Sequence, residues 1–440
     1  MARAKKEAAL TPEERLQAAL VPDWEWPYKL PENWCWLKLV ESFDNHTDSK
    51  KKIKQKDYLV KGKLAVVDQG QELIGGYTND VEKSYSGALP IVIFGDHTRC
   101  IKFVDFPFAQ GADGVKVLRP KPFYLPKAFY YALQSVNIPN LGYRRHFPLF
   151  NKFSIPLPPF TEQQRIVDRI ESLFTKLDEA KEKAQAVMDS FETRKAAILH
   201  KAFTGELTAK WRRTHGLSLD TWKEVAADSL FEYVTSGSRG WAKYYDESGA
   251  VFIRMGNLDH GTIELDFSDI QHVKLPNKAE GQRSRIRKND ILISITADVG
   301  MVGLVRNDDF EGYINQHIAL ARPVMSESAE FIAWYLVSDI GLKQMQEKQR
   351  GATKVGLSLN DIRALQLKIP LIEEQNEILK VIKMWIGKEQ QSQEAAEAVL
   401  DQIDLMKKSI LARAFRGELG TNDPSEESAV ELLKRGLEKK

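Results

Sequence analysis

Residues 155–166 read IPLPPFTEQQRI, and the segment that they open closes with AILHKAFTGEL at residues 197–207. A second copy begins with IPLIEEQNEI at residues 369–378 and closes with SILARAFRGEL at residues 409–419. Aligned without a gap, residues 162–207 and 374–419 keep a constant offset of 212 positions and share 18 identities in 46. Chance does not preserve register over that length, so the sequence indicates a unit of globular segment plus long helix that occurs twice.

Both copies carry apolar residues at heptad spacing, the pattern of a helix that packs lengthwise against another helix. Roughly 42 residues at about 1.5 Å per residue give each helix a length of about 60 Å. A helix of that length cannot bury its apolar seam alone, so we expect the two helices to pair with each other in antiparallel fashion. The residues expected on the two seams are Ile166, Ile170, Leu173, Leu177, Val187, Phe191, Ile198, Ile378, Ile382, Trp385, Val399, Ile403, Met406 and Ile410.

Local signals mark the ends and the irregular points of these helices. Thr161 and Gln164 have the spacing of a capping box at the start of the first helix, and Gly205 is typical of its C-terminus. Arg194 interrupts the first seam, and the segment Gly387–Ser392 interrupts the second. If either helix bends, we expect the bend near Gly387–Ser392.

Length and composition describe an ordinary globular protein. The chain has 440 residues, enough for two or three domains, and 43% of them are hydrophobic. The charged N-terminus and the lack of an apolar run of about 18 residues predict a cytoplasmic protein without membrane contact. Two distant cysteines, Cys35 and Cys100, and eight scattered histidines offer no disulfide framework and no metal site. The formal net charge of only +2 means that any nucleic-acid contact must come from local basic patches.

Short apolar runs separated by turn residues predict two mixed α/β domains. Strands are expected at residues 63–69, 88–95 and 114–120, and again at 250–258, 290–297, 300–305 and 316–323, with helices at 128–134 and 331–338. The predicted fold class is α+β: two α/β domains separated by an antiparallel coiled coil of two long helices, with a pseudo-twofold internal repeat. The expected parts are an N-terminal helix and linker (1–29), a first globular domain (30–154), a first helical repeat (155–210), a second globular domain (211–368), a second helical repeat (369–420) and a tail helix (421–440).

Sequence motifs of catalysis are missing. The chain has no G-x-x-x-x-G-K-[ST] loop to bind nucleotide phosphates, and Gly300 and Gly303 are too close together to form a cofactor loop. The prolines of Leu157–Phe160 faintly resemble the Pro-Pro-aromatic loop of amino-methyltransferases, but Leu157 cannot accept a hydrogen bond from a target amine. We therefore expect no catalytic residue, no bound metal and no cofactor in this chain.

Basic residues gather in loops of both domains, interleaved with aromatic, Ser and Gln side chains. Such cations displace counterions from phosphates, and Arg and Gln can read the edges of guanine and adenine. A charged loop is also a common solvated surface, so each cluster alone leaves both interpretations open, whereas recurrence in both domains favours DNA. The candidate DNA-binding residues are Lys50, Lys51, Lys52, Lys54, Arg99, Arg144, Arg145, His146, Ser238, Arg239, Lys243, Arg283, Arg285, Lys288, Gln316, Lys348, Arg350 and Lys354.

The order of a domain, a helix that ends in AFTGEL, a second domain and a helix that ends in AFRGEL resembles the specificity subunit of type I restriction–modification systems. LPENWCWLKL (30–39), IVIFGDHTR (91–99) and FAQGADGVKVL (108–118) extend the resemblance, which covers essentially the entire chain. It implies two target recognition domains, each reading one half of a bipartite site on double-stranded DNA, spaced by the coiled coil. It also implies two methyltransferase subunits docked on the helices and two motor and nuclease subunits in the full complex. S-adenosylmethionine, ATP and Mg would then be bound by those partners.

Two other interpretations remain open. The chain could be a coiled-coil scaffold that binds proteins without DNA specificity. It could also have an enzymatic activity of its own, which rests only on the resemblance of Pro158-Pro159-Phe160 to a methyltransferase loop.

Overall fold

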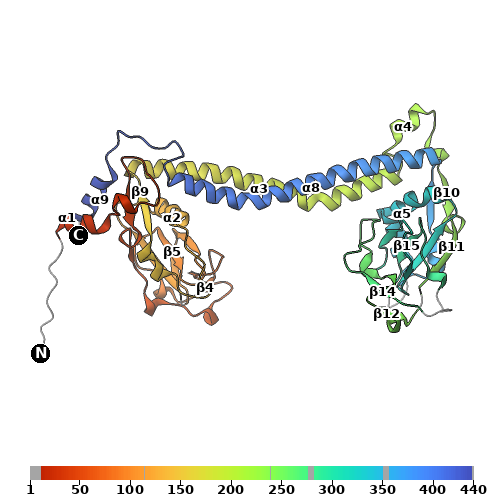
Figure 1. The fold of residues 1–440 in the computed structure, drawn as a ribbon, viewed down its shortest axis with the longest axis horizontal. Helices are drawn as coiled ribbons and strands as arrows, with labels where there is room; N and C mark the ends of the chain where they lie inside the picture. Colours follow the sequence, from red (N-terminus) through yellow and green to blue (C-terminus); the bar gives the residue numbers. More distant parts are fainter. Residues whose placement is uncertain (1–10, 113, 238, 276–281, 350–355, 439–440) are drawn as a thin grey trace. The chain divides into compact units, whose positions relative to one another are not determined.

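The computed structural model describes residues 11–112, 114–237, 239–275, 282–349 and 356–438 (Figure 1). The chain divides into two compact units, Met1–Glu182 with Val399–Lys440 (unit 1) and Lys183–Ala398 (unit 2). The long helices α3 (Phe160–Phe203) and α8 (Ile372–Ala414) contribute to both. Among the described residues, no helix combines the length and the apolar character needed to cross a membrane.

The globular domain of unit 1 consists of two sheets and helix α2 (Pro126–Ser135). One sheet has the strand order β2-β8-β5-β6 and the other has the order β4-β3-β7, with β3 and β7 parallel. The strands are β2 (Phe43–Asn45), β3 (Leu64–Val67), β4 (Gly76–Thr78), β5 (Ile91–Gly95), β6 (Ile101–Val104), β7 (Phe108–Gln110) and β8 (Val115–Pro120). The strands and the helix predicted for this domain are confirmed.

Strand β5 separates two layers of core because successive side chains of a strand point to opposite faces. Val92 and Phe94 pack in the same core as Phe129 of α2. Ile91 and Ile93 pack in a second core, together with Phe108 of β7. All four β5 side chains are fully buried, which explains why this strand reads as a continuous apolar run.

The globular domain of unit 2 repeats this arrangement (Figure 1). Its sheets have the orders β11-β18-β15-β16 and β12-β14-β13-β17, and β13 and β17 are again parallel. The strands are β11 (Phe231–Ser236), β12 (Tyr245–Asp246), β13 (Ala250–Ile253), β14 (Gln271–Val273), β15 (Ile291–Ser294), β16 (Val302–Leu304), β17 (Gly312–Ile314) and β18 (Ile318–Pro323), and the short helices are α5 (Ala329–Val337), α6 (Asp339–Glu347) and α7 (Leu359–Arg363). Strand β15 takes the place of β5: its residues alternate between a core shared with α5 and a core shared with β13 and β17.

Each globular domain opens and closes on a two-stranded antiparallel ribbon. In unit 1, β1 (Cys35–Lys38) pairs with β9 (Ser154–Leu157). In unit 2, β10 (Lys223–Ala226) pairs with β19 (Gln366–Ile369). Because β9 and β19 lead directly into α3 and α8, each ribbon fixes its domain to the start of a long helix.

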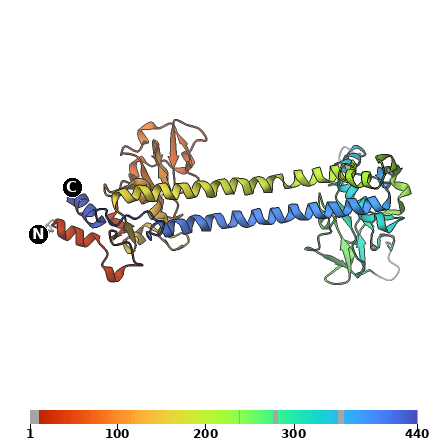
Figure 2. The ribbon, with the colours of Figure 1, turned by 90° about the horizontal axis from the view of Figure 1, so that it is seen from above.

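Helices α3 and α8 contact each other in antiparallel orientation within each unit (Figure 2). In unit 1, the ammonium group of Lys407 pairs with Asp178 at 2.5 Å and lies 5.2 Å from the centre of the Phe174 ring. In unit 2, Nε of Arg194 donates to Oε2 of Glu389 over 2.6 Å. The two polar residues that interrupt the apolar seams in the sequence are therefore partners. Helix α8 continues without interruption through Gly387–Ser392.

The seam predicted for α8 is wrong at three positions. Trp385, Val399 and Met406 are 41%, 42% and 45% exposed, whereas Ile378, Ile382 and Ile403 are buried. The half-buried residues are instead one position further along, at Ile386, Leu400 and Lys407. Lys407 occupies its position because its ammonium group lies over the Phe174 ring and pairs with Asp178. In α3, all the residues expected on the seam are buried or half-buried.

The two ends of the described chain meet in unit 1. Helix α1 (Pro12–Ala19) begins with a capping box of Thr11 and Glu14 and packs against α9 (Ala429–Glu438). Leu433 of α9 is fully buried in the core of the first domain. The segment Val21–Pro31, expected to be a linker, packs on that core as well, because its apolar side chains cover the ribbon β1–β9.

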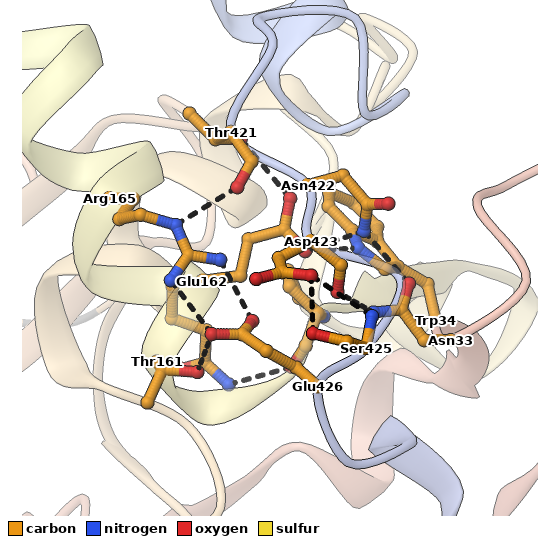
Figure 3. A network of polar contacts seen from close by, with 12 residues as sticks. Asn33, Trp34, Thr161, Glu162, Arg165, Thr421, Asn422, Asp423, Ser425 and Glu426 are labelled. Atoms are coloured by element: carbon orange, nitrogen blue, oxygen red, sulfur yellow. Dashed lines mark hydrogen bonds and ion pairs between the residues drawn. The ribbon is translucent and has the colours of Figure 1, made fainter.

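A polar network, which we call the first junction, ties the start of α3 to the segment that follows α8 (Figure 3). Glu162 is fully buried, and its carboxylate accepts hydrogen bonds from Trp34 Nε1 (2.7 Å), Thr421 Oγ1 (3.1 Å) and Asn422 Nδ2 (2.9 Å). Thr161 does not cap α3, which already begins at Phe160. Its hydroxyl group instead donates to Glu426 over 2.6 Å.

The second junction ties the start of α8 to the segment that follows α3. Glu374 corresponds to Glu162 in the repeat and is likewise fully buried. Its carboxylate accepts hydrogen bonds from Trp222 Nε1 (3.0 Å), from Thr208 Oγ1 (2.7 Å) and from the guanidinium group of Arg212 in α4 (Ala209–Thr214). The GEL motif of each repeat thus places a threonine on the carboxylate at the start of the other helix.

Candidate nucleic-acid interface

In the first domain, the turn between β5 and β6 holds the loop that follows α2. Asp96 in the turn is buried, and its carboxylate accepts hydrogen bonds from Arg145 Nε (3.0 Å) and from the backbone N–H of Phe147 (2.7 Å). His97 stacks on Tyr143 with ring centres 5.3 Å apart. The buried carboxylate therefore fixes the position of an exposed aromatic and cationic loop.

Lys116 on β8 is a further cation near this loop, and it is not among the candidates predicted from the sequence. Its side chain is half-buried, and its ammonium group lies 5.1 Å from the centre of the Phe147 ring. Burial lowers the pKa of Lys116, Asp96 opposes this change, and the positive charges of Arg145 and Lys52 lower the pKa further. Lys52, Lys116 and Arg145, which are far apart in the sequence, are thus close enough in space to interact electrostatically.

We call Lys52, His97, Lys116, Tyr143 and Arg145 the first basic surface. Lys50 and Lys54 are exposed in the same loop as Lys52, and Arg144 is exposed beside Arg145. Lys51 is half-buried, and its ammonium group donates to the carbonyl oxygen of Ser84 over 2.9 Å.

Two candidates of the first domain have structural roles. His146 is fully buried, so the expectation that it contacts DNA is wrong: its Nδ1 donates to the carbonyl oxygen of Asp96 (2.9 Å) and its Nε2 accepts from the backbone N–H of Leu141 (3.1 Å). Arg99 is half-buried with a backbone φ of 62°, and its guanidinium group donates to the carbonyl oxygen of Ile138 over 3.0 Å.

In the second domain, several candidates surround one hollow of about 600 Å³, which we call the second basic hollow. Arg239 and Lys243 come from the loop after β11, Arg283 from the segment before β15, and Gln316 from the turn between β17 and β18. The arginine and lysine side chains are exposed, whereas Gln316 is half-buried. The hollow is lined by Ser236, Gly237, Arg239, Trp241, Lys243, Tyr244, Arg283, Ile295, Thr296, Gln316, Leu357, Ser358 and Leu359.

Gly237 allows the loop after β11 to lie directly on the turn that carries Gln316. A Cβ atom at this position would lie 2.1 Å from the carbonyl oxygen of Ile314 and 2.3 Å from that of Asn315. No side chain can be accommodated at such distances from backbone atoms. The loop with Arg239 and Lys243 therefore depends on this glycine for its position.

The remaining candidates of the second domain lie elsewhere or outside the described residues. Arg285 and Lys288 are exposed before β15 and do not line the hollow. Lys348 is half-buried at the end of α6. Ser238, Arg350 and Lys354 fall outside the described residues.

The two interfaces are built from corresponding loops. Each uses the loop after the first strand of the four-stranded sheet (β2 or β11) and the turn after the central strand (β5 or β15). In the described part of the chain, no group of His, Cys, Asp and Glu side chains could hold a metal ion.

Comparison with known proteins agrees with this architecture. The family model described as "Type I restriction modification DNA specificity domain" matches residues 31–187 and 220–397. The specificity subunit of the Escherichia coli type I restriction enzyme EcoBI is 27% identical over 282 residues, which cover 60% of this chain and 58% of the relative. The corresponding StySPI subunit of Salmonella potsdam is 23% identical over 277 residues, 61% of this chain and 58% of the relative. In these alignments the chain spans less than two thirds of each relative's length.

Solved structures share the fold. The HsdS subunit from Thermoanaerobacter tengcongensis superposes with a TM-score of 0.56 at 19% identity, over 90% of this chain and 99% of that one. Two family domains in one chain, each with a four-stranded sheet of corresponding strand order and each followed by a long helix and a GEL sequence, place this chain in the type I restriction–modification DNA specificity family.

Proposed function

We propose that the chain is the DNA-reading subunit of a type I restriction–modification complex, in which each globular domain recognises one half of a bipartite site on double-stranded DNA. The observation that carries this proposal is that both family domains expose cations on the loop after the first strand of the four-stranded sheet, with Lys50 and Lys54 after β2 and Arg239 and Lys243 after β11. Loop cations neutralise backbone phosphates and position the protein, while neutral polar groups between them are free to read bases. A scaffold without DNA specificity would not need cations at corresponding loops of two domains that differ in sequence.

The two long helices act as the spacer in this proposal. As an antiparallel coiled coil related by a pseudo-twofold axis, they would set the number of base pairs left unread between the half-sites. Two half-sites are needed because each matched base pair contributes only about 1–3 kcal/mol to discrimination. Support comes from the contacts of α3 with α8 in both units.

The helices also dock the methyltransferase subunits in this proposal. Exposed apolar side chains on α8 support it: Trp385 in unit 2 and Leu405 and Met406 in unit 1 are 41%, 64% and 45% exposed. Methyl transfer with S-adenosylmethionine, and DNA cleavage driven by ATP with Mg, would belong to two methyltransferase and two motor subunits. This chain would contribute no catalytic residue and would work in the cytoplasm.

The experiment that tests the function maps methylated adenines genome-wide in cells that express the methyltransferase with and without this chain. We expect a bipartite motif that appears only when the chain is present. Methylation without any sequence motif, in cells where the two proteins co-purify, would favour the scaffold interpretation instead.

A shorter spacer tests the role of the helices. Residues 183–189 and 395–401 correspond in the repeat, and their joint deletion shortens each helix by about 10 Å. At about 3.4 Å per base pair, we expect the gap in the methylated motif to shorten by roughly three base pairs while both half-sites stay unchanged. An unchanged gap in a methylating complex would contradict the role as a ruler.

A further inference from the structure

The lining of the second basic hollow includes an amide group, that of Gln316, which is held by a chain of hydrogen bonds. Gln316 Nε2 lies 2.9 Å from Nε2 of His317, and Nδ1 of His317 contacts the hydroxyl group of Thr296. All three side chains are half-buried, and Gln316 and Thr296 both line the hollow. The amide of Gln316 is therefore oriented by its neighbours before any ligand arrives.

The direction of these hydrogen bonds determines which donor and which acceptor of Gln316 remain available to a ligand. An amide nitrogen can only donate, so Nε2 of His317 accepts, and its Nδ1 carries the proton and donates to Thr296. One N–H of the amide is used in this way. The second N–H and the carbonyl oxygen Oε1 of Gln316 remain for a ligand that needs one donor and one acceptor side by side.

The charges around the hollow match a nucleic acid. Arg239, Lys243 and Arg283 line it as exposed cations, suited to the phosphates that flank a base. The amide among them is neutral, so it adds nothing to phosphate attraction. Its remaining donor and acceptor match the major-groove edge of adenine, where N7 accepts and the N6 amino group donates.

We infer that Gln316 reads an adenine in the half-site bound by the second domain, with Oε1 accepting from N6 and Nε2 donating to N7, and with His317 and Thr296 as positioning residues. This inference rests on the proposed function, since it assigns one base contact within it. It predicts that one position of one half-site depends on a single side chain.

The test measures base preference with the complex of this chain and its methyltransferase, using double-stranded DNA libraries in which each half-site position carries all four bases. For Gln316→Ala, the preference for adenine at one position of the second half-site should fall about tenfold, as expected for loss of a bidentate contact. For Gln316→Glu, which presents only acceptors, the preference should move toward cytosine, whose N4 donates. The first half-site should not change in either variant.

A matched control is Gln346→Ala, which removes an exposed glutamine of the same unit outside the hollow and should leave every preference unchanged. Thr296→Val should weaken the adenine preference and Thr296→Ser should restore it, which a purely structural role would not do. If Gln316→Ala accumulates poorly, the isosteric Gln316→Glu carries the test alone.

The possible results distinguish a failure of the inference about Gln316 from a failure of the proposed function. A wild-type complex without any bipartite preference would overturn the proposed function and the inference with it. A wild-type bipartite preference that Gln316→Ala and Gln316→Glu leave unchanged at every position would overturn the inference alone. A uniform loss of methylation with an unchanged base preference would also overturn it, because a phosphate contact or a structural defect acts on all sequences alike.

Discussion

The first and second junctions build the same connection from different donors. In both, a tryptophan at the start of a globular domain and a threonine after GEL bind the buried carboxylate of Glu162 or Glu374. The first junction adds the neutral amide of Asn422, whereas the second adds the guanidinium group of Arg212, which is 7% exposed. The repeated residues fix the geometry, and the residues outside the repeat decide how the buried charge is compensated.

Connectivity explains this difference. After α3, the chain must continue into the second domain, and α4 turns it there while placing Arg212 against Glu374. After α8, the chain is free to return along the first domain as α9, and its intervening segment supplies Asn422 and Glu426. The second junction is therefore stabilised by a buried ion pair. The first is stabilised by hydrogen bonds from neutral donors and by a more exposed salt bridge between Arg165 and Glu426.

The largest expected effect is a difference in the free energy of unfolding between variants of the two buried carboxylates. Glu374→Gln leaves the guanidinium group of Arg212 buried without a counter-charge, which typically costs about 3–5 kcal/mol. Glu162→Gln disturbs only hydrogen bonds from neutral donors and should cost about 1–3 kcal/mol. Urea unfolding, with hydrogen exchange to locate the loss near residues 203–222 or 415–426, measures both.

Glu373→Gln is the control, because this exposed neighbour should change the free energy of unfolding by no more than about 0.5 kcal/mol. Equal losses for Glu374→Gln and Glu162→Gln would contradict the distinction between the two junctions.

A smaller effect is expected where the helices pair. Arg194 and Glu389 form a polar pair in unit 2, and the positions that correspond to them in the repeat are Met406 and Leu177. Arg194→Met should destabilise unit 2 by about 1–2 kcal/mol, since it leaves the carboxylate of Glu389, only 17% exposed, without its partner.

The double variant Arg194→Met with Glu389→Leu should recover that loss, because an apolar pair of similar volume replaces a half-buried ion pair at little or no cost. A double-mutant cycle by thermal unfolding provides the measurement. A double variant as unstable as the sum of the single variants would show that the two side chains do not interact.

The smallest effect is a pH dependence that belongs to the first junction. Arg165 donates to both oxygens of Glu426 over 2.8 Å, and these hydrogen bonds lower the pKa of the Glu426 carboxyl group. A lowered pKa contributes stability above the usual value of the carboxyl group, and this stability is lost as the pH falls through the folded-state pKa. Because Arg165 is 40% exposed, the contribution at pH 7 should be below about 1 kcal/mol.

Glu426→Gln should remove that small contribution at pH 7 and leave the variant and the wild type equally stable near pH 3. Unfolding curves at the two pH values provide the comparison. A difference that grows as the pH falls would contradict the assignment.

Much of the architecture could be predicted from patterns that act locally. The run IVIFG predicts β5 because every one of its side chains is buried between two layers. The duplication was visible because the glutamate and GEL residues of both junctions recur at the constant offset of 212 positions.

The α8 seam is a feature that local sequence patterns do not predict correctly. Trp385, Val399 and Met406 keep perfect heptad spacing and are nevertheless exposed. Heptad spacing identifies an apolar stripe, but only the partner helix decides which stripe it covers. Polar Glu389 and Lys407 occupy the contact because Arg194 and Asp178 lie opposite them.

The candidate DNA-binding residues likewise include some that the sequence predicts and some that only the fold identifies. Basic loops in both domains were visible in the sequence, but His146 could not be recognised as buried, since its partners Asp96 and Leu141 are contacts of the folded loop. Lys116 joins Lys52 and Arg145 only because β8 lies in the middle of the sheet.

The sequence by itself determined the repeat, the two domains, the long helices and the family, because these depend on periodicity and on identities at a fixed offset. Only the tertiary structure decided which cations share a surface, which stripe of α8 stays open and how Gln316 is oriented. Those features depend on residues brought together from distant strands and loops, and on hydrogen bonds such as that of Gln316 with His317, which no local pattern specifies.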